Sequence, residues 1–247
     1  MYLSAEGAKV QSQRLEFIAN NLANLETPGF KRDVPTFQAR FAEAIQQGSD
    51  YAGSKSGNDV GGGVKLIDVA TDFSSGTLRS TEVPTDFAVN GDGFFQVRNP
   101  AGETLLTRAG DFHVDAEGRL LTQTGRFEVL DDGGGPIQLD PERPWQFLTG
   151  GLIDQDGSRI AIGLQQPDSL GDLVKVGSNA FRSLGTVTPV PTTERDIRQG
   201  YLEQAGVSST REMMSMIETS RAFEANTKLI QHQDGMLSQL LSRVLRS

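Results

Sequence analysis

The chain has 247 residues, of which 36% are hydrophobic, with a formal net charge of −9 and no cysteine. Its length and apolar content are enough for one large domain or two ordinary ones with a buried core. The excess of acidic residues argues against a nucleic-acid partner, and the lack of cysteine excludes disulfides, thiol catalysis and cysteine-ligated metal.

The first residues, MYLSAEGAKVQSQR, lack the basic and apolar segments of a cleaved secretory signal. No run of the sequence approaches the roughly 20 apolar residues that a membrane span needs. We therefore expect a chain that stays in the cytosol or is exported by a route that leaves no such mark.

Residues 3–25 predict a first helix, because they contain no proline and a single glycine. Pro28 disfavours the α-conformation at Thr27 and should end the helix there. The apolar positions follow the narrow spacing of a coiled-coil seam: Leu15, Ile18, Leu22 and Leu25. The same segment also carries three asparagines, which are poor helix formers: Asn20, Asn21 and Asn24.

The middle of the chain predicts a mainly antiparallel β domain over residues 76–200. Short apolar runs are separated by turn signals such as NPAGE (99–103), DAEGR (115–119) and DDGGG (131–135). Residues 31–75 are expected to form an extended connector, and their glycine- and serine-rich part, 48–63, should be a flexible loop.

Residues 208–247 predict a second long helix, because they contain no proline and Gly235 is their only glycine. Ser208 or Ser209 can cap its start, with Glu212 in capping-box position after Ser209. An apolar residue recurs every seventh position: Met216, Phe223, Ile230, Leu237 and Val244. The stripe is widened by Met213, Leu229, Met236, Leu240 and Leu241.

An α+β fold follows, in which the N- and C-terminal helices pair as a coiled-coil-like element beside the β domain. A single apolar stripe has no partner within its own segment, and the stripe at the other terminus is the obvious one. The alternative is that both helices fold back as an ordinary cap on the β core.

No catalytic, cofactor or metal site emerges from the sequence. His113 and His232 lie in unrelated segments without an H-x-x-x-H partner, and no G-x-S-x-G motif is present. The stretch DQDGS (154–158) opens like a calcium loop, but Arg159 replaces the glycine and Gln165 the bidentate glutamate that such a loop requires. We interpret this stretch as an Asp-Gly turn between strands.

Four blocks resemble the flagellar basal-body rod and hook proteins. They are NNLANLETPGFKR (20–32), GTLRSTEVPTDFAVNGDGFFQV (76–97), LLTRAGDFHVDAEGRLLTQTGRFEVL (105–130), and GYLEQAGVSSTREMMSMIETSRAFEANTKLIQHQDGML (200–237). LEQAGV (202–207) stands where the family more usually has Leu-Glu-x-Ser-Asn-Val, so Ala205 and Gly206 depart from the pattern. The length and the second block look most like the proximal- and distal-rod members, and the segment after GFKR favours the proximal one.

The resemblance implies a structural, non-enzymatic subunit without cofactor, exported by the flagellar type III apparatus. Such subunits assemble with themselves and other rod subunits into a hollow axial tube of the basal body, outside the cytoplasm in the periplasmic rod. The implied assembly residues are, at the N-terminus, Leu15, Ile18, Asn20, Asn21, Leu22, Asn24, Leu25, Thr27, Pro28, Gly29 and Phe30, and on the C-terminal helix, Met213, Met216, Phe223, Asn226, Ile230, Leu237, Leu241 and Val244.

Three other interpretations of the sequence are a different axial subunit, a carbohydrate-binding module and a hydrolase. The chain could be a distal-rod or hook-type subunit rather than a proximal one. An extracellular adhesin or carbohydrate-binding β module would want a platform of exposed aromatics, yet the chain has one Trp and three Tyr, and its 13 Phe suit a core. A hydrolase lacks its catalytic constellation, so no small-molecule substrate is expected, and the net charge of −9 argues against a nucleic-acid partner.

Overall fold

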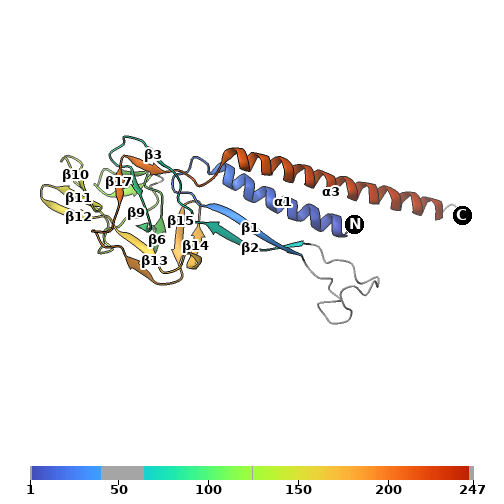
Figure 1. Ribbon diagram of the computed structural model, residues 1–247, viewed down its shortest axis with the longest axis horizontal. Helices are drawn as coiled ribbons and strands as arrows, with labels where there is room; N and C mark the ends of the chain where they lie inside the picture. The colour runs from blue at the N-terminus through green and yellow to red at the C-terminus, as the bar shows by residue number, and fades with distance from the viewer. Residues whose placement is uncertain (1, 40–63, 124, 245–247) are drawn as a thin grey trace. The chain divides into compact units, whose positions relative to one another are not determined.

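The computed structural model describes residues 2–39, 64–123 and 125–244, and the chain forms two compact units. The first, which we call the helical unit, comprises residues 1–23, 33–71 and 208–247. The second, the β unit, comprises residues 24–32 and 72–207. In Figure 1 the N-terminal helix is blue and the C-terminal helix is red, and the strands of the β unit lie between the two helices in sequence.

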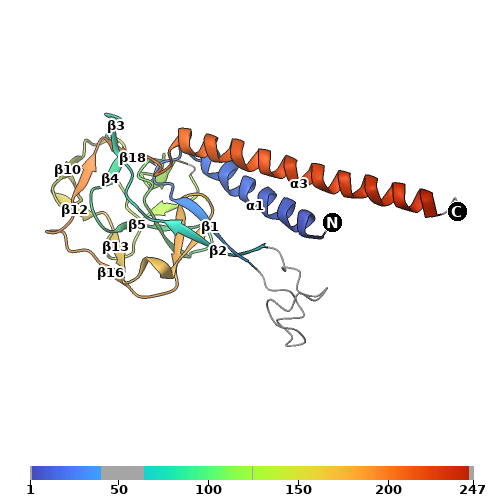
Figure 2. The ribbon, with the colours of Figure 1, turned by 45° about the vertical axis from the view of Figure 1, so that its right-hand side comes forward.

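The helical unit pairs the two ends of the chain. Helix α1 (Tyr2–Ala23) and helix α3 (Ser209–Val244) lie side by side and run antiparallel, and α3 continues past the first residues of α1 (Figures 1 and 2). Strands β1 (Arg32–Ala39) and β2 (Val64–Asp72) form a two-stranded sheet. Within the described residues, neither helix has the apolar run that crossing a membrane requires.

Both predicted helices are confirmed, with small differences at their ends. Helix α1 stops at Ala23, so Leu25 lies in the turn that follows it. The carbonyl of Ser208 accepts the N–H of Glu212 at 3.0 Å, which makes Ser208 the N-cap of α3. The capping box expected between Ser209 and Glu212 is therefore wrong by one residue, because Glu212 follows the true cap by four positions.

The β unit is built from antiparallel strands throughout its described pairs. Its largest sheet has the order β14-β15-β6-β5-β9-β8-β7, and β13 joins β5 to β16. Its strands are β5 (Phe94–Arg98), β6 (Thr104–Thr107), β7 (Phe112–Val114), β8 (Leu120–Thr122), β9 (Glu128–Val129), β13 (Leu164–Pro167), β14 (Leu173–Val176), β15 (Ala180–Ser183) and β16 (Val187–Pro189).

Three smaller sheets and one short 3₁₀ helix, η1 (Leu170–Asp172), complete this unit. They are β10-β11-β12, β17-β4 and β18-β3. Their strands are β3 (Leu78–Ser80), β4 (Phe87–Val89), β10 (Gln146–Leu148), β11 (Leu152–Gln155), β12 (Ser158–Ala161), β17 (Ile197–Gln199) and β18 (Tyr201–Glu203).

The large sheet is buried on both faces, because neighbouring residues of its central strand enter different clusters. Phe95 packs into the main core with Phe87 and Phe112, whereas Phe94 joins a second cluster with Phe181. Successive side chains of a strand point to opposite faces, so the pair Phe94–Phe95 places one ring in each core.

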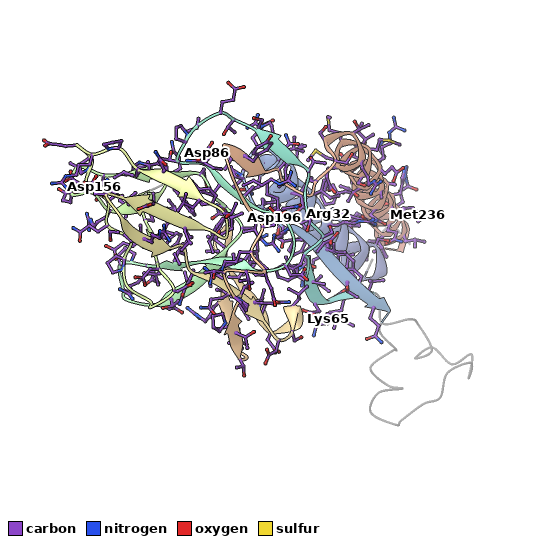
Figure 3. The ribbon with its side chains drawn as sticks, turned by 60° about the vertical axis from the view of Figure 1, so that its left-hand side comes forward. Arg32, Lys65, Asp86, Asp156, Asp196 and Met236 are labelled. Atoms are coloured by element: carbon purple, nitrogen blue, oxygen red, sulfur yellow. The ribbon has the colours of Figure 1, made fainter. Side chains whose placement is uncertain are left out.

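The Asp-Gly turn expected at residues 154–158 is confirmed. Asp156 and Gly157 both have positive φ, 55° and 87°, and they join β11 to β12 as a two-residue hairpin loop. Asp156 stands at the tip of this hairpin in Figure 3. An Asp-Gly pair adopts positive φ at two successive positions more readily than most other pairs. The turn therefore accounts for the aspartate at position 156 without a bound cation.

The α+β class is confirmed by two helices and many antiparallel strands. The residues expected to be a connector, 31–75, contain strands β1 and β2 in their described part, so that part is more regular than expected. The predicted flexible loop, 48–63, lies outside the described residues. The sequence-based division into a helical assembly domain of residues 1–30 and 208–247, a connector and a β domain differs from these units at residues 24–30, which belong to the β unit.

Asp111 makes the stability of the β unit depend on pH. Burial, assisted by the nearby charge of Asp86, raises the pKa of Asp111 to about 6. The folded chain therefore binds this proton more tightly than the unfolded chain. The stabilisation is fully present below the unfolded pKa, near 3.8, and is lost as the pH rises through about 6.

We expect Asp111→Asn to raise the free energy of unfolding by about 2 kcal/mol at pH 8, after allowance for solvent screening of a partly exposed group, with no gain near pH 4. Urea unfolding followed by the fluorescence of Trp145, the single tryptophan, measures this. The exposed Asp168→Asn is the control and should change little at either pH. An equal gain for Asp111→Asn at both pH values would contradict the assignment.

Candidate functional site

The face of α1 toward α3 is only thinly apolar. Among the described side chains of α1, the buried ones are Val10, Ile18 and Asn21, with 9%, 6% and 1% of their surface exposed. Of the positions predicted from the seam, Ile18 is buried, while Leu15 and Leu22 are half-buried. The helix pair therefore excludes water around a few residues rather than along a continuous stripe.

The predicted stripe on α3 divides into two parts. Met216, Phe223 and Ile230 are half-buried, whereas Leu237 and Leu241 are 48% and 62% exposed. The exposed pair belongs to the part of α3 that continues past α1 (Figures 1 and 2). The last turns of α3 carry further exposed apolar side chains, Met236 and Leu240, and Figure 3 labels Met236 on this helix. Met213 is 47% exposed near the start of α3, and the side chain of Val244 lies outside the described residues.

Polar residues occupy every alternate layer of the inward face of α3, and the sequence reasoning largely missed them. They recur every seven residues, like the apolar stripe: Glu212, Thr219, Asn226 and Gln233. Glu212 and Thr219 are buried, and Asn226 lies against α1 so closely that a Cβ at Gly7 would come within 3.2 Å of its Nδ2. Counting polar as well as apolar residues at heptad spacing could have found this pattern.

Two of the three asparagines join α1 to β1. The Nδ2 of Asn21 donates to the carbonyl of Asp33 and its Oδ1 accepts the N–H of Asp33, both at 3.0 Å. Asn20 donates to the Asp33 carboxylate at 3.1 Å, from an exposed position. The side chain of Asn21 thus pairs with a backbone unit as a neighbouring strand would.

The remaining motif residues form a turn within the β unit. The carbonyl and side-chain oxygens of Asn24 accept hydrogen bonds from Thr27, while Leu25 and Pro28 line a small cavity of about 160 Å³. Gly29 has φ +65°, and a Cβ there would lie 2.3 Å from the backbone of Ala109, so only glycine fits. Phe30 is fully buried.

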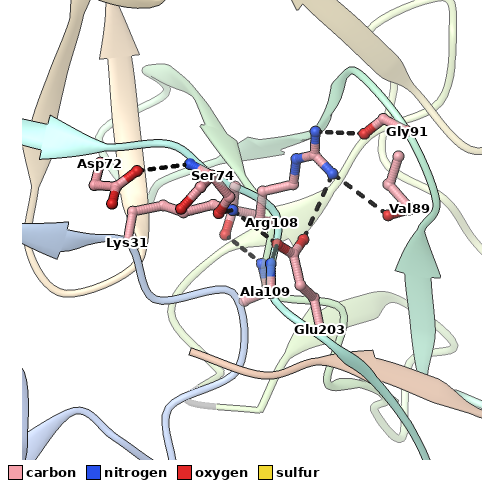
Figure 4. A network of polar contacts seen from close by, with 10 residues as sticks. Lys31, Asp72, Ser74, Val89, Gly91, Arg108, Ala109 and Glu203 are labelled. Atoms are coloured by element: carbon pink, nitrogen blue, oxygen red, sulfur yellow. Dashed lines mark hydrogen bonds and ion pairs between the residues drawn. The ribbon is translucent and has the colours of Figure 1, made fainter. Parts of the chain in front are cut away.

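A buried ionic network follows directly after this turn (Figure 4). Lys31 Nζ lies 2.7 Å from Glu203 Oε1 and 2.9 Å from the carbonyl oxygen of Ser74. Arg108 approaches the other oxygen of Glu203 at 3.5 Å and donates to the carbonyl of Gly91 at 2.7 Å. The side chains of Lys31 and Glu203 are each 2% exposed, so the pair is shielded from water.

Burial and charge act in opposite directions on this network. Desolvation lowers the pKa of Lys31, and the carboxylate of Glu203 opposes that shift. Desolvation likewise lowers the pKa of Arg108, again against the effect of Glu203. A buried charge that lost its partner would be costly, so all three residues depend on one another. The burial of Lys31, which is 1% exposed as a whole residue, could not be predicted from the sequence, because lysines that follow a turn are usually exposed.

Within the described residues, the contacts of this network are ion pairs and hydrogen bonds of buried groups. Neither His113 nor His232 belongs to it, and the described residues contain no group of three His, Asp or Glu side chains placed to hold a metal ion. The described side-chain contacts of Glu203 are to the cations Lys31 and Arg108 and to the backbone N–H of Gly76.

Comparison with known proteins identifies the family of this chain. The profile "Flagella basal body rod protein" matches residues 1–31, "Flagellar hook protein FlgE/F/G D1 domain" matches residues 88–188, and "Flagellar basal body rod FlgEFG protein C-terminal" matches residues 198–243. The flagellar basal-body rod protein FlgF of Caulobacter vibrioides is 36% identical over 235 residues, which cover 93% of this chain and 91% of that protein. The chain belongs to the flagellar basal-body rod protein family.

Proteins named FlgG are also similar to this rod-family protein over nearly its whole length. The flagellar basal-body rod protein FlgG of Borreliella burgdorferi is 31% identical, covering 96% of this chain and 95% of its own. FlgG of Bacillus subtilis is 32% identical, with coverage of 98% and 97%. The family is the one that the sequence blocks indicated, and its members are structural components of the flagellar basal body.

Asn21→Ala should weaken the junction of α1 with β1. The substitution leaves the N–H and carbonyl of Asp33, a residue only 8% exposed, without the amide that they bind. We expect a loss of about 2–3 kcal/mol in the local stability of this junction. Hydrogen exchange at the Asp33 amide reports it directly.

The neighbouring Asn20→Ala is the matched control, because it removes one exposed hydrogen bond to the same residue. It should cost less than about 1 kcal/mol. Equal exchange rates in the two variants would show that the buried amide of Asn21 has no special role.

Proposed function

We propose that this protein is a rod subunit that polymerises through its terminal helices into the hollow axial shaft of the basal body. Its partners are further copies of itself and other rod subunits, and it reaches the periplasmic part of the rod through the flagellar type III export apparatus. The paired helices α1 and α3 act as a coiled-coil-like element, and the residues at their interface and on the free part of α3 make the subunit contacts.

The observation that carries this proposal is the apolar surface of α3 beyond α1. Met236, Leu237, Leu240 and Leu241 are between 48% and 62% exposed, although they continue the helix that α1 partly covers. Full burial of one such side chain is worth roughly 1.5–3 kcal/mol, so a neighbouring helix would gain substantially by covering them. Exposed apolar patches of this kind commonly mark protein interfaces.

The relatives support a rod position without choosing one. FlgF of Caulobacter vibrioides and FlgG of Borreliella burgdorferi are both similar over more than nine-tenths of this chain. We propose the proximal rod, on the segment after GFKR, with the distal rod or the hook as the alternative. Quantifying the chain in isolated basal bodies with and without their distal rod separates these positions. Its absence from basal bodies would overturn the rod assignment altogether.

The double variant Leu237→Glu, Leu241→Glu should abolish motility and incorporation into basal bodies. Two carboxylates on the apolar surface would have to be desolvated at the subunit interface, which costs several kcal/mol. The purified variant should keep the β-unit unfolding transition of the parent chain, because both residues are exposed.

Gln231→Glu with Gln239→Glu is the matched control, since it adds the same charge at exposed polar positions of the same helix. It should leave motility close to that of the parent strain. Normal motility in the leucine variant, or equal loss in the control, would count against this surface as the assembly contact.

A further inference from the structure

The two segments of the β unit that adjoin helices α1 and α3 are bonded to each other. Residues 24–32 follow α1, and residues 203–207 precede α3. The N–H of Gly29 donates to the carbonyl of Glu203 at 2.9 Å, and the N–H of Gly206 donates to the carbonyl of Phe30 at 3.4 Å. We call 24–32 and 203–207 the exit segments. They lie together in the fold although they come from opposite ends of the sequence.

Side chains close the same junction from inside. Lys31, on the first exit segment, and Glu203, on the second, form the 2.7 Å ion pair. Glu203 also accepts the N–H of Gly76 at 2.9 Å, and Arg108 lies 3.5 Å from its second oxygen (Figure 4). Both oxygens of the carboxylate are therefore engaged, one of them by the opposite exit segment.

A third contact holds the first exit segment from another strand. Lys175 of β14 donates to the carbonyl of Lys31 at 2.9 Å, and its ammonium lies 4.0 Å from the centre of the Phe30 ring. At Gly29 the backbone passes so close to residues 108 and 109 that no side chain fits. The segment is thus fixed in position over three successive residues.

Stability alone does not account for this arrangement. Replacing a buried ion pair by well-packed apolar residues is often neutral or stabilising, so the pair is better explained by the geometry that it imposes. Helices α1 and α3, for their part, bury few apolar side chains against each other. We propose that Lys31, Glu203 and Arg108 form a clasp that holds the exit segments together and so pre-organises the antiparallel pairing of α1 with α3.

The physical basis is the cost of bringing distant segments together. Without the clasp, α1 and α3 would have to find each other as the ends of a long loop, with the corresponding loss of chain entropy. With it, the last residue of α1 and the first of α3 continue from adjacent segments, as in a helical hairpin. Their effective concentration then rises without any additional contact between the helices.

Lys31→Met tests the clasp, because it removes the ammonium and keeps an apolar side chain in the site. Hydrogen exchange of the free chain, followed by mass spectrometry, should show α1 amides exchanging roughly tenfold faster or more. The unfolding midpoint of the β unit, followed by Trp145 fluorescence, should fall as well, because Glu203 keeps a buried charge, and the control shows how much α1 exchange a loss of β-unit stability causes by itself. Lys31→Arg, which retains the charge, should restore part of the protection of α1.

The control is Asp132→Asn, which breaks another ion pair of the β unit. Arg195 holds both oxygens of Asp132 at 2.8 Å, with a guanidinium that is 2% exposed, and neither residue belongs to an exit segment. Parent-like exchange of α1 in Lys31→Met would overturn the proposal. So would an equal acceleration of α1 in Asp132→Asn, because that would make the effect one of general β-unit stability.

If Lys31→Met unfolds the β unit, a milder pair of variants tests whether the joining of the exit segments protects α1 from exchange. Gly206→Pro removes the N–H that binds Phe30, whereas Gly206→Ala keeps it, and no atom lies within 3.5 Å of a Cβ at this position. We expect α1 exchange to rise a few-fold, about threefold, in the proline variant only. Equal exchange in both would overturn the clasp. All these measurements use the free chain, so their outcome is independent of whether the protein assembles into a rod.

Discussion

The enclosure of a lysine ammonium with a glutamate carboxylate sets the arrangement of the β unit around its exit segments. Lys31 and Glu203 are 172 positions apart in sequence, and each would carry an uncompensated buried charge without the other. Their remaining hydrogen-bonding capacity is met by the backbone of Ser74 and Gly76 and by Arg108. The first exit segment, the loop before β3 and strand β18 must therefore all be in place before the pair can be sealed from water.

This requirement gives the signature at residues 20–32 two separate tasks. Its first part, through Asn20 and Asn21, binds the start of β1 and belongs to the helical unit. Its second part, from the turn to Lys31, is bound inside the β unit. The short segment thus spans the division between the two units, which is why residues of such different character stand side by side in it.

Sequence reasoning succeeded where structure depends on near neighbours and failed where it depends on distant ones. Helical periodicity and Asp-Gly turn chemistry act within a few residues, so α1, α3 and the hairpin at Asp156 were predictable. The role of Asn21 depends on Asp33, 12 positions away across a turn. The burial of Lys31 depends on strand β18, and no local pattern distinguishes it from an exposed lysine. The family resemblance indicated the protein family without revealing either contact.

The polar positions on α3 limit the stability of the helix pair. Polar residues recur between the apolar ones on the inward face of α3, and α1 buries few apolar side chains. Thr219 satisfies its hydroxyl on the carbonyl of Ser215 in its own helix, whereas the buried side-chain oxygens of Gln11 and Gln233 have no hydrogen-bond partner within the described chain. Thr219 therefore needs no partner from α1, whereas Gln11 and Gln233 leave hydrogen-bonding capacity unused. Each of these buried, unpaired oxygens costs free energy, so the helix pair is less stable than its length alone would indicate.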